Sequence, residues 1–155
     1  MYQKQNVTFR RAAGIALILP LMILCGWRTG VYLEFGRSIE GHLKRAADAN
    51  SVELAERELQ TALGVMEARG MTEGYSSVFY QTPSDDIGYW HDNLKTSLEE
   101  LKALPPDASP LEKSNMLIKL RETILDHDND GENVTAPSGI TAYPHNKLFA
   151  ALCVL

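Results

Sequence analysis

One uninterrupted apolar segment near the amino terminus constrains this chain more than any other feature. Residues 12–27 have the sequence AAGIALILPLMILCGW and contain no charge, and apolar residues continue beyond Arg28 to residue 33. At about 1.5 Å per residue, residues 12–27 span roughly 24 Å, whereas residues 12–33 reach the roughly 30 Å of a hydrocarbon layer. Trp27 and Tyr32 suit the membrane–water interface. We therefore predict a transmembrane anchor over residues 12–33.

Three other interpretations of this segment stay open. A cleaved signal peptide fits the basic start, although no small-residue cleavage site follows. A lipoprotein signal would use Cys25, but Met22 to Leu24 lack the small residue expected beside that cysteine. A buried helix in a soluble core is the third alternative. Under the anchor interpretation, we expect Pro20 to kink the helix without breaking it.

Charge divides the chain into two unlike parts. Residues 1–28 carry four basic groups and no acid, whereas residues 29–155 carry eleven basic and twenty acidic groups, a net charge of −9. An acidic body would be repelled by phosphates, which excludes nucleic acid as an expected partner. The basic residues 1–11 favour a cytoplasmic amino terminus under the positive-inside rule. We expect a single-pass protein of the plasma (inner) membrane with its body outside the cytoplasm.

The remaining sequence predicts an all-α fold. Helical periodicity after residue 33 extends the anchor into a stalk to about Asp48, with a bend at a glycine. Asn50 with Glu53, Thr82 with Pro83, and Ser109 with Pro110 are the start signals of three further helices. The first of these ends at Gly70. We predict that residues 34–126 form a small antiparallel helical bundle.

Residues 127–155 do not continue this pattern. They contain an acidic loop, then VTAPSGITAYP, which we expect to be irregular or extended. The last eight residues, LFAALCVL, form an apolar run that is too short to span a bilayer. We expect this tail to pack on the bundle, to lie on the membrane, or to begin a second span.

The most specific local motif is DHDNDGE at residues 126–132. Acids at alternate positions before a glycine resemble the first half of an EF-hand calcium loop, with Asp126, Asp128, Asp130 and Glu132 as ligands. The second half departs from that pattern, because Pro137 occupies the position of the bidentate glutamate. We therefore expect a solvated acidic loop, with weak calcium binding as the alternative, and we expect no other cofactor.

Aromatic residues concentrate between the second and third predicted helices. The five are Tyr75, Phe79, Tyr80, Tyr89 and Trp90. Aromatic side chains at such a junction either plug one end of a short bundle or line a partner surface. We expect the plug, and if the chain has a partner surface we expect it here.

Catalytic motifs are not evident in the sequence. No Gly-x-Ser-x-Gly, Gly-x-Gly-x-x-Gly or His-Glu-x-x-His pattern occurs. His91, with Asp92, Tyr80 and Tyr89, is the one set that could perform acid–base chemistry of the hydrolase type. We predict no catalytic residues and treat this enzyme as the least favoured hypothesis.

Two resemblances follow from the anchor and the helices behind it. The chain resembles small single-pass bacterial membrane proteins, and its span with a helical body is similar to bacterial receptor sensor domains. It lacks the glutamate near the start of the span that pilins carry, because Glu34 comes too late. Gly26 and Gly30 form a G-x-x-x-G pair, which leaves a homo-oligomer open. We expect a noncatalytic accessory protein that contacts membrane lipid and a protein partner, with a ligand- or calcium-responsive sensor as the alternative.

Overall fold

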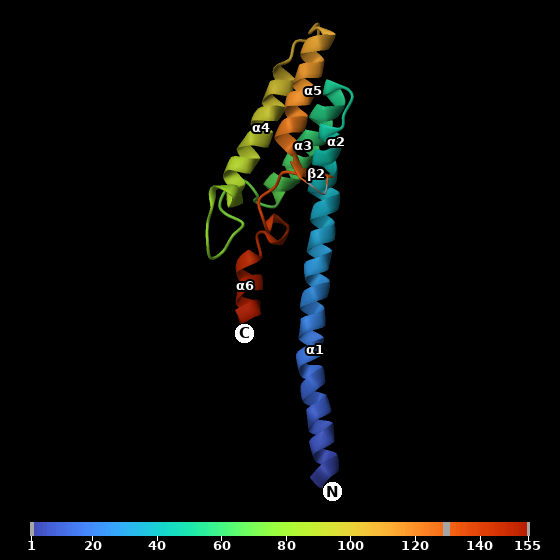
Figure 1. The fold of residues 1–155 in the computed structure, drawn as a ribbon, viewed down its shortest axis with the longest axis vertical. Helices are drawn as coiled ribbons and strands as arrows, with labels where there is room; N and C mark the ends of the chain where they lie inside the picture. The colour runs from blue at the N-terminus through green and yellow to red at the C-terminus, as the bar shows by residue number, and fades with distance from the viewer. Residues whose placement is uncertain (1, 129–130, 155) are drawn as a thin grey trace.

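The computed structural model describes the backbone of residues 2–128 and 131–154, and the side chains of residues 18–126 and 131–152. One long helix projects from a bundle of shorter helices, and a short carboxyl-terminal helix lies beside it (Figure 1). About 70% of the chain is helical, which confirms a mostly helical fold. A two-stranded sheet is also present, so the prediction of an all-α fold is wrong in this detail.

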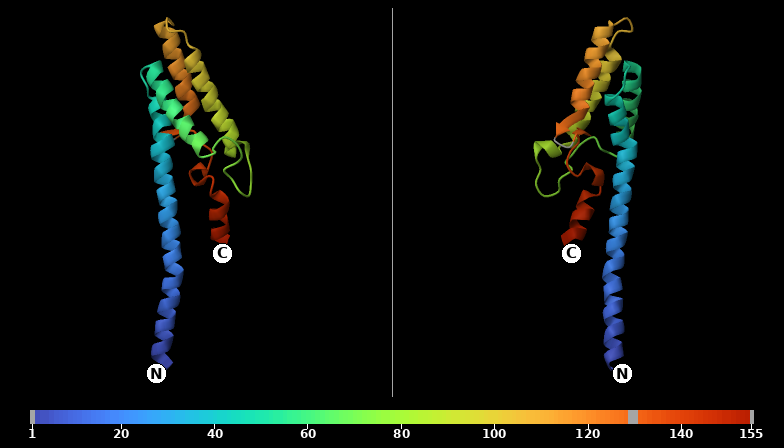
Figure 2. Two further views of the ribbon diagram at one scale, coloured as in Figure 1. Left: turned by 180° about the vertical axis from the view of Figure 1, so that it is seen from behind. Right: turned by 45° about the vertical axis from the view of Figure 1, so that its right-hand side comes forward.

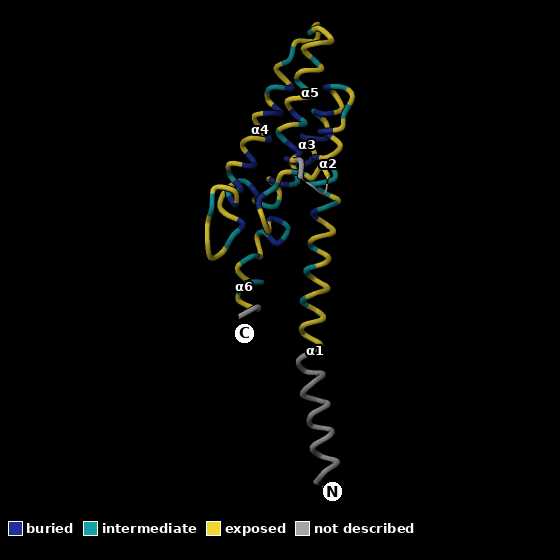
Figure 3. The backbone as a smooth tube through the Cα atoms, viewed as in Figure 1, coloured by how far each residue is buried: buried dark blue, intermediate teal, exposed yellow. Residues whose placement is uncertain are grey.

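The long helix starts near the amino terminus and runs into the bundle. Helix α1 (Tyr2–Phe35) continues through a π-helical turn, η1 (Gly36–Glu40), into α2 (Gly41–Ala47). It passes through Pro20 without a break, as predicted. Residues 18–34 are exposed or half-buried, as the yellow and teal tube in Figure 3 shows. The alternative of a buried core helix is therefore wrong, and the helix from Ile18 is long and apolar enough to cross a membrane.

The π-helical turn replaces the predicted bend at a glycine. The Gly41 N–H donates to the Gly36 carbonyl, five residues back. A β-carbon at Gly41 would lie 3.1 Å from that carbonyl oxygen, so glycine permits the close approach. Residues four apart drift by about 40° around an ideal helix, because each residue turns about 100°. A wider turn reduces this drift and keeps Phe35, Ile39 and Leu43 on one face.

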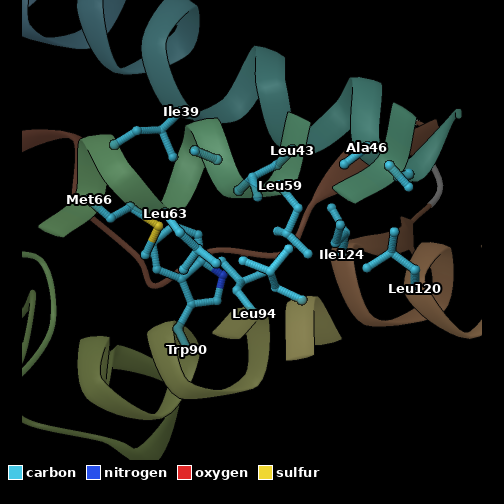
Figure 4. Packing of buried hydrophobic residues seen from close by; sticks show 14 of the residues in the cluster. Ile39, Leu43, Ala46, Leu59, Leu63, Met66, Trp90, Leu94, Leu120 and Ile124 are labelled. Carbon is cyan, nitrogen blue, oxygen red and sulfur yellow. The ribbon is translucent and has the colours of Figure 1, made fainter. Parts of the chain in front are cut away.

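The face that carries this stripe enters the core, so beyond Glu34 the continuing helix is part of the bundle and not a separate stalk. Phe35 is buried and is followed by Ile39, Leu43 and Ala46, which are at most 3% exposed. They pack against α3 (Val52–Ala68), and α4 (Ile87–Ala103) and α5 (Pro110–Ile124) close the core from the other side (Figure 4). The labelled core residues of these three helices are Leu59, Leu63, Met66, Trp90, Leu94, Leu120 and Ile124.

Helix α3 (Val52–Ala68) is terminated by Gly70 as predicted, but its amino-terminal cap is not the predicted residue. Ser51, not Asn50, is the cap, and its hydroxyl accepts from the Leu54 N–H. At the other end Gly70 adopts φ of 68°. Its N–H donates to the Glu67 carbonyl, and the N–H of the next residue, Met71, donates to the Met66 carbonyl. This pair of bonds is the Schellman motif, which satisfies the last carbonyls of the helix.

Helix α4 (Ile87–Ala103) starts four residues later than predicted. Thr82 and Asp85 form a capping box, but it closes a short 3-10 helix, η2 (Pro83–Asp85). Asp86 then caps α4 by accepting from the Tyr89 N–H at 3.0 Å. The two caps follow one another directly in the chain, and together they fix the direction in which α4 leaves the loop.

Helix α5 (Pro110–Ile124) begins as predicted. The Ser109 hydroxyl accepts from the Glu112 N–H, and the Glu112 carboxylate accepts from the Ser109 N–H at 2.7 Å. Its apolar stripe is only partly buried, however. Leu120 and Ile124 reach the core, whereas Leu111 and Ile118 are exposed.

Residues 127–155 contain regular structure where an irregular segment was predicted. Strands β1 (Leu125–Asp128) and β2 (Gly131–Val134) form an antiparallel hairpin in which Leu125 pairs with Val134. A 3-10 turn, η3 (Ile140–Ala142), and helix α6 (Asn146–Val154) follow. The hairpin forms despite its acidic sequence, because Leu125 is buried and Val134 packs against the core.

The end of α3 gives a matched test of this backbone. Gly70→Ala should destabilise the protein by about 1 kcal/mol, because alanine resists positive φ. Gly64→Ala, in the interior of the same helix, should stabilise it by up to about 1 kcal/mol, because alanine is the better helix former. No heavy atom lies within 4 Å of a β-carbon at either position. Urea unfolding in detergent micelles measures both, and equal effects of one sign would contradict the assignment.

Candidate functional site

The aromatic junction is a loop with a fixed base. Residues 71–82 connect α3 to η2 and hang from the end of the bundle that faces the amino terminus of α1 (Figures 1 and 2). An isolated bridge joins Tyr75 to Asp86 at the base. The Ser76 N–H donates to Asp85, and the Ile87 N–H donates to Gly74 at 2.9 Å. Ser76 and Asp85, next to this bridge, are buried, and residues 77–84 between them are exposed or half-buried.

The predicted plug is wrong for four of the five aromatic residues. Phe79 and Tyr80 are 82% and 78% exposed, and Tyr75 and Tyr89 are exposed as well. Only Trp90 is buried, and its indole Nε1–H donates to the Thr135 carbonyl at 2.7 Å. Trp90 thereby ties α4 to the segment after the hairpin, and the other four rings are available to contacts outside the chain.

The structure separates the five residues into three groups, and Phe79 and Tyr80 line neither of the cavities beside the other three. Tyr89 and Trp90 line a cavity of about 320 Å³ beside the start of α4. Tyr75 lines a second cavity of about 260 Å³, between the loop and Tyr143. The predicted surface is therefore not one continuous patch, and the first cavity is the better defined site. We call it the α4 groove, and its lining residues are Pro83, Ser84, Asp86, Tyr89, Trp90, Asn93, Leu94, Thr123, Asp126 and Thr135–Ser138.

The α4 groove combines aromatic, proline and acidic groups. The exposed Tyr89 ring stands on one wall, and the buried Pro137 lies on the other. Asp86 and Asp126 place carboxylates on the lining. Aromatic faces and carboxylates both attract cationic side chains. Sequence reasoning missed the second wall, residues 135–138, because nothing in the sequence connects the turn residues Pro137 and Ser138 with a helix more than forty positions earlier.

Three of the four predicted calcium ligands, Asp126, Asp128 and Glu132, lie in the strands of the hairpin instead of an open loop. Asp126 pairs with Asn133 in the register, and Asp128 pairs with Gly131. The Glu132 carboxylate accepts from Arg121, which also binds Asp48 at 2.8 Å. Asp130 lies outside the described residues, and Asp128 is described only as backbone. Among the described side chains no group of three or more His, Cys, Asp or Glu residues could hold a metal ion. Because the side chains of Asp128 and Asp130 are not among those described, calcium binding stays a prediction.

His91 does not share a face with Tyr89. Two residues apart on a helix correspond to about 200° of rotation, so the two side chains leave α4 on opposite sides. His91 is 5% exposed, with Nε2 3.8 Å from Glu67 of α3 and Nδ1 3.4 Å from Asp92. Of the four residues of the hydrolase hypothesis, His91 and Asp92 are in contact, whereas Tyr89 points away from His91 and Tyr80 is in the exposed loop.

A buried carboxylate joins α2 to α3. Glu58 is 6% exposed, and its oxygens accept from His42 Nδ1 at 2.7 Å and from Arg45 Nη2 at 2.5 Å. The hydrogen bond from His42 is the largest cause that lowers the pKa of Glu58 below 4.5, and the charge of Arg45 adds to it. A buried carboxylate needs charged or hydrogen-bonding partners, and His42 and Arg45 supply them here. We therefore assign this cluster a structural role.

Models of known protein families, curated proteins and solved structures show no match to this chain.

Glu58→Gln tests the buried cluster. We expect the variant to lose about 1–3 kcal/mol of unfolding free energy at pH 7, because a buried charge-assisted network is broken. A lowered pKa stabilises the fold above the unfolded value near 4.5, and this contribution disappears as the pH falls through the folded value. The difference between wild type and variant should therefore shrink between pH 5 and pH 3.

Thermal unfolding in detergent, followed by circular dichroism, measures this difference. Glu99→Gln, an exposed glutamate on α4, is the matched control and should have little effect at either pH. A difference that stays constant across this range would show that the charge of Glu58 is not the source of the stabilisation.

Proposed function

We propose that this chain is a noncatalytic, membrane-anchored interaction protein. Helix α1 holds it in the plasma (inner) membrane as a single span, with its amino terminus in the cytoplasm and its acidic bundle on the other side. The α4 groove then receives a protein partner of the membrane or envelope. The observation that carries this proposal is the apolar surface of α1 around Pro20, which the described part of the chain leaves exposed.

That surface has a large free-energy cost in water. Five large apolar residues on the two sides of Pro20 are 57–66% exposed. Burying such a side chain is worth about 1.5–3 kcal/mol, so the set forfeits on the order of 5 kcal/mol in water. A whole domain is stable by only about 5–15 kcal/mol. The five residues are Ile18, Leu19, Leu21, Met22 and Ile23. Transfer of these side chains from water into lipid removes the cost.

Alkaline carbonate extraction tests the anchor. We expect full-length protein to stay in the membrane pellet, because its apolar helix is held by acyl chains and not by charge. Exchange of Leu19 and Ile23 for aspartate should release it, because each acid in a span costs roughly 2.5–3.5 kcal/mol. Leu111→Asp with Ile118→Asp, a matched exposed pair on α5, should stay in the pellet. Release of the unaltered protein would contradict the anchor.

The chemistry of the α4 groove favours a partner segment with a basic side chain. Tyr89 supports a cation–π contact, and the carboxylates of Asp86 and Asp126 lie on the same lining. The net charge of −9 over residues 29–155 attracts such a partner at longer range. Aromatic rings on a groove are also typical of sites that bind extended peptides.

Site-specific cross-linking tests the groove. A photoreactive residue at position 89 should yield a discrete adduct in intact cells, whereas one at position 118 on α5 should not. In detergent extracts, Tyr89→Ala should weaken retention of the cross-linked partner about tenfold, because central aromatic residues contribute about 1–2 kcal/mol or more. Ile118→Ala serves as the control. Equal adducts at both positions would argue against a defined partner site in the groove.

A further inference from the structure

Helix α6 is apolar on every side, although the protein covers only one of its sides. Its sequence, NKLFAALCV, contains a single charged residue, Lys147. Leu148 and Leu152 are 47% and 41% exposed, and Ala151 between them is exposed too. A helix that is hydrophobic all round is found in a protein core or in a membrane. Since no core surrounds these residues, their surroundings must come from outside the chain.

The covered side of α6 is held against α1. The ring of Phe149 lies 4.8 Å from that of Trp27, and the ring of His145 lies 5.5 Å from it. The Arg28 guanidinium stands over Phe149 at 5.6 Å and donates to Thr141 Oγ1 at 3.0 Å. These contacts join the carboxyl-terminal segment to a defined level of the long helix.

That level lies inside the apolar segment of α1. Trp27 belongs to residues 12–33, and from there α6 runs beside α1 toward its amino terminus (Figures 1 and 2). Nine helical residues cover roughly 13 Å, a little less than half of a hydrocarbon layer. A helix satisfies its own backbone hydrogen bonds, so α6 meets the main condition for entering lipid.

The aromatic loop lies at the same end of the bundle. Asn146, the first residue of α6, donates to the Ser76 carbonyl, and Tyr143 donates from its hydroxyl to the Glu73 carbonyl at 3.3 Å. The loop reaches down to about the start of α6 in both views (Figures 1 and 2). Its exposed Phe79 and Tyr80 are residues that favour the membrane–water interface.

We propose that α6 inserts into the same lipid leaflet as the carboxyl-terminal part of α1, with the tip of the aromatic loop at the headgroup level. The occupant of the exposed apolar face of α6 is thus the acyl-chain region of a bilayer. Lys147, at the start of α6, lies where an anionic headgroup would neutralise it. The insertion gives the bundle a second attachment and fixes its orientation on the membrane. This inference rests on the proposed span of α1.

Depth-dependent quenching tests the insertion. Full-length protein, with Cys25 and Cys153 replaced by serine, receives one cysteine with an environment-sensitive fluorophore: Leu19→Cys on α1, Leu152→Cys on α6 or Ser114→Cys on α5. The α4–α5 end of the bundle is the end farthest from the amino terminus (Figure 1). The probe is a vesicle of equal parts phosphatidylcholine and phosphatidylglycerol, with a nitroxide on the acyl chain.

We expect several-fold quenching at positions 19 and 152 and almost none at position 114. Quenching at 19 without quenching at 152 would overturn the inference and leave the anchor intact. No quenching at any of the three positions would overturn the anchor as well, so the two failures are distinguishable.

A second variant covers the case in which a label at position 152 disturbs α6. The fluorophore is placed at Phe79→Cys, and the nitroxide is moved to the lipid headgroup. Leu152→Asp should reduce the quenching at position 79 several-fold, because it withdraws α6 from lipid and lifts the loop. Leu111→Asp on α5 should leave it unchanged. Equal quenching in both variants would contradict a joint insertion of α6 and the loop.

Discussion

The whole structure depends on one helix whose surroundings change along its length. From Ile18 to Glu34 its side chains are exposed or half-buried, with contacts to the rest of the protein at Trp27, Arg28 and Glu34, and from Phe35 onward one face lies in the core. The change is made without a loop, because the π-helical turn keeps Phe35, Ile39 and Leu43 in line. The bundle is therefore built directly on the end of the apolar helix and not hung from it by a linker. Removing α2 would take with it the surface on which α3 packs.

Polar contacts position the remaining elements around this helix. Glu58 joins α3 to α2 through His42 and Arg45. Arg69, at the end of α3, binds Glu34 at 2.6 Å and so fixes the border between the uncovered and the buried part of the long helix. Trp90 holds the segment after the hairpin through the Thr135 carbonyl. The α4 groove is a consequence of this last bond, because its two walls come from segments that Trp90 connects.

Local signals in the sequence predicted the helices well. Ser109, Pro110 and Glu112 specify the start of α5 by contacts within four residues, and Gly70 specifies the end of α3 through its positive φ. Such features depend on neighbours in sequence and can be found there. Thr82 and Pro83 do mark a helix start, but the helix that starts there is the short η2. Helix α4 starts at a second cap, Asp86, four residues later.

Long-range contacts account for the errors. The local sequence of the hairpin, with its acids and glycine, favours a loop. The hairpin forms because Leu125 lies in the core and Arg121 binds Glu132. The aromatic residues were expected inside because of their type, yet the bridge between Tyr75 and Asp86 closes the loop below them and leaves Phe79 outside. The second wall of the α4 groove and the contact of Phe149 with Trp27 join positions far apart in the chain. Periodicity cannot identify such pairs.

The span proposed for α1 would make the tilt of the bundle depend on the thickness of the bilayer, because the helical path from α1 to α2 is unbroken. A span longer than the hydrocarbon layer tilts to match it. A hinge would absorb that tilt, but here the helix enters the core of the bundle rigidly and carries the bundle with it. The angle at which the acidic surface meets its neighbours is then set by lipid composition, and a thinner membrane inclines that surface more strongly than a thicker one.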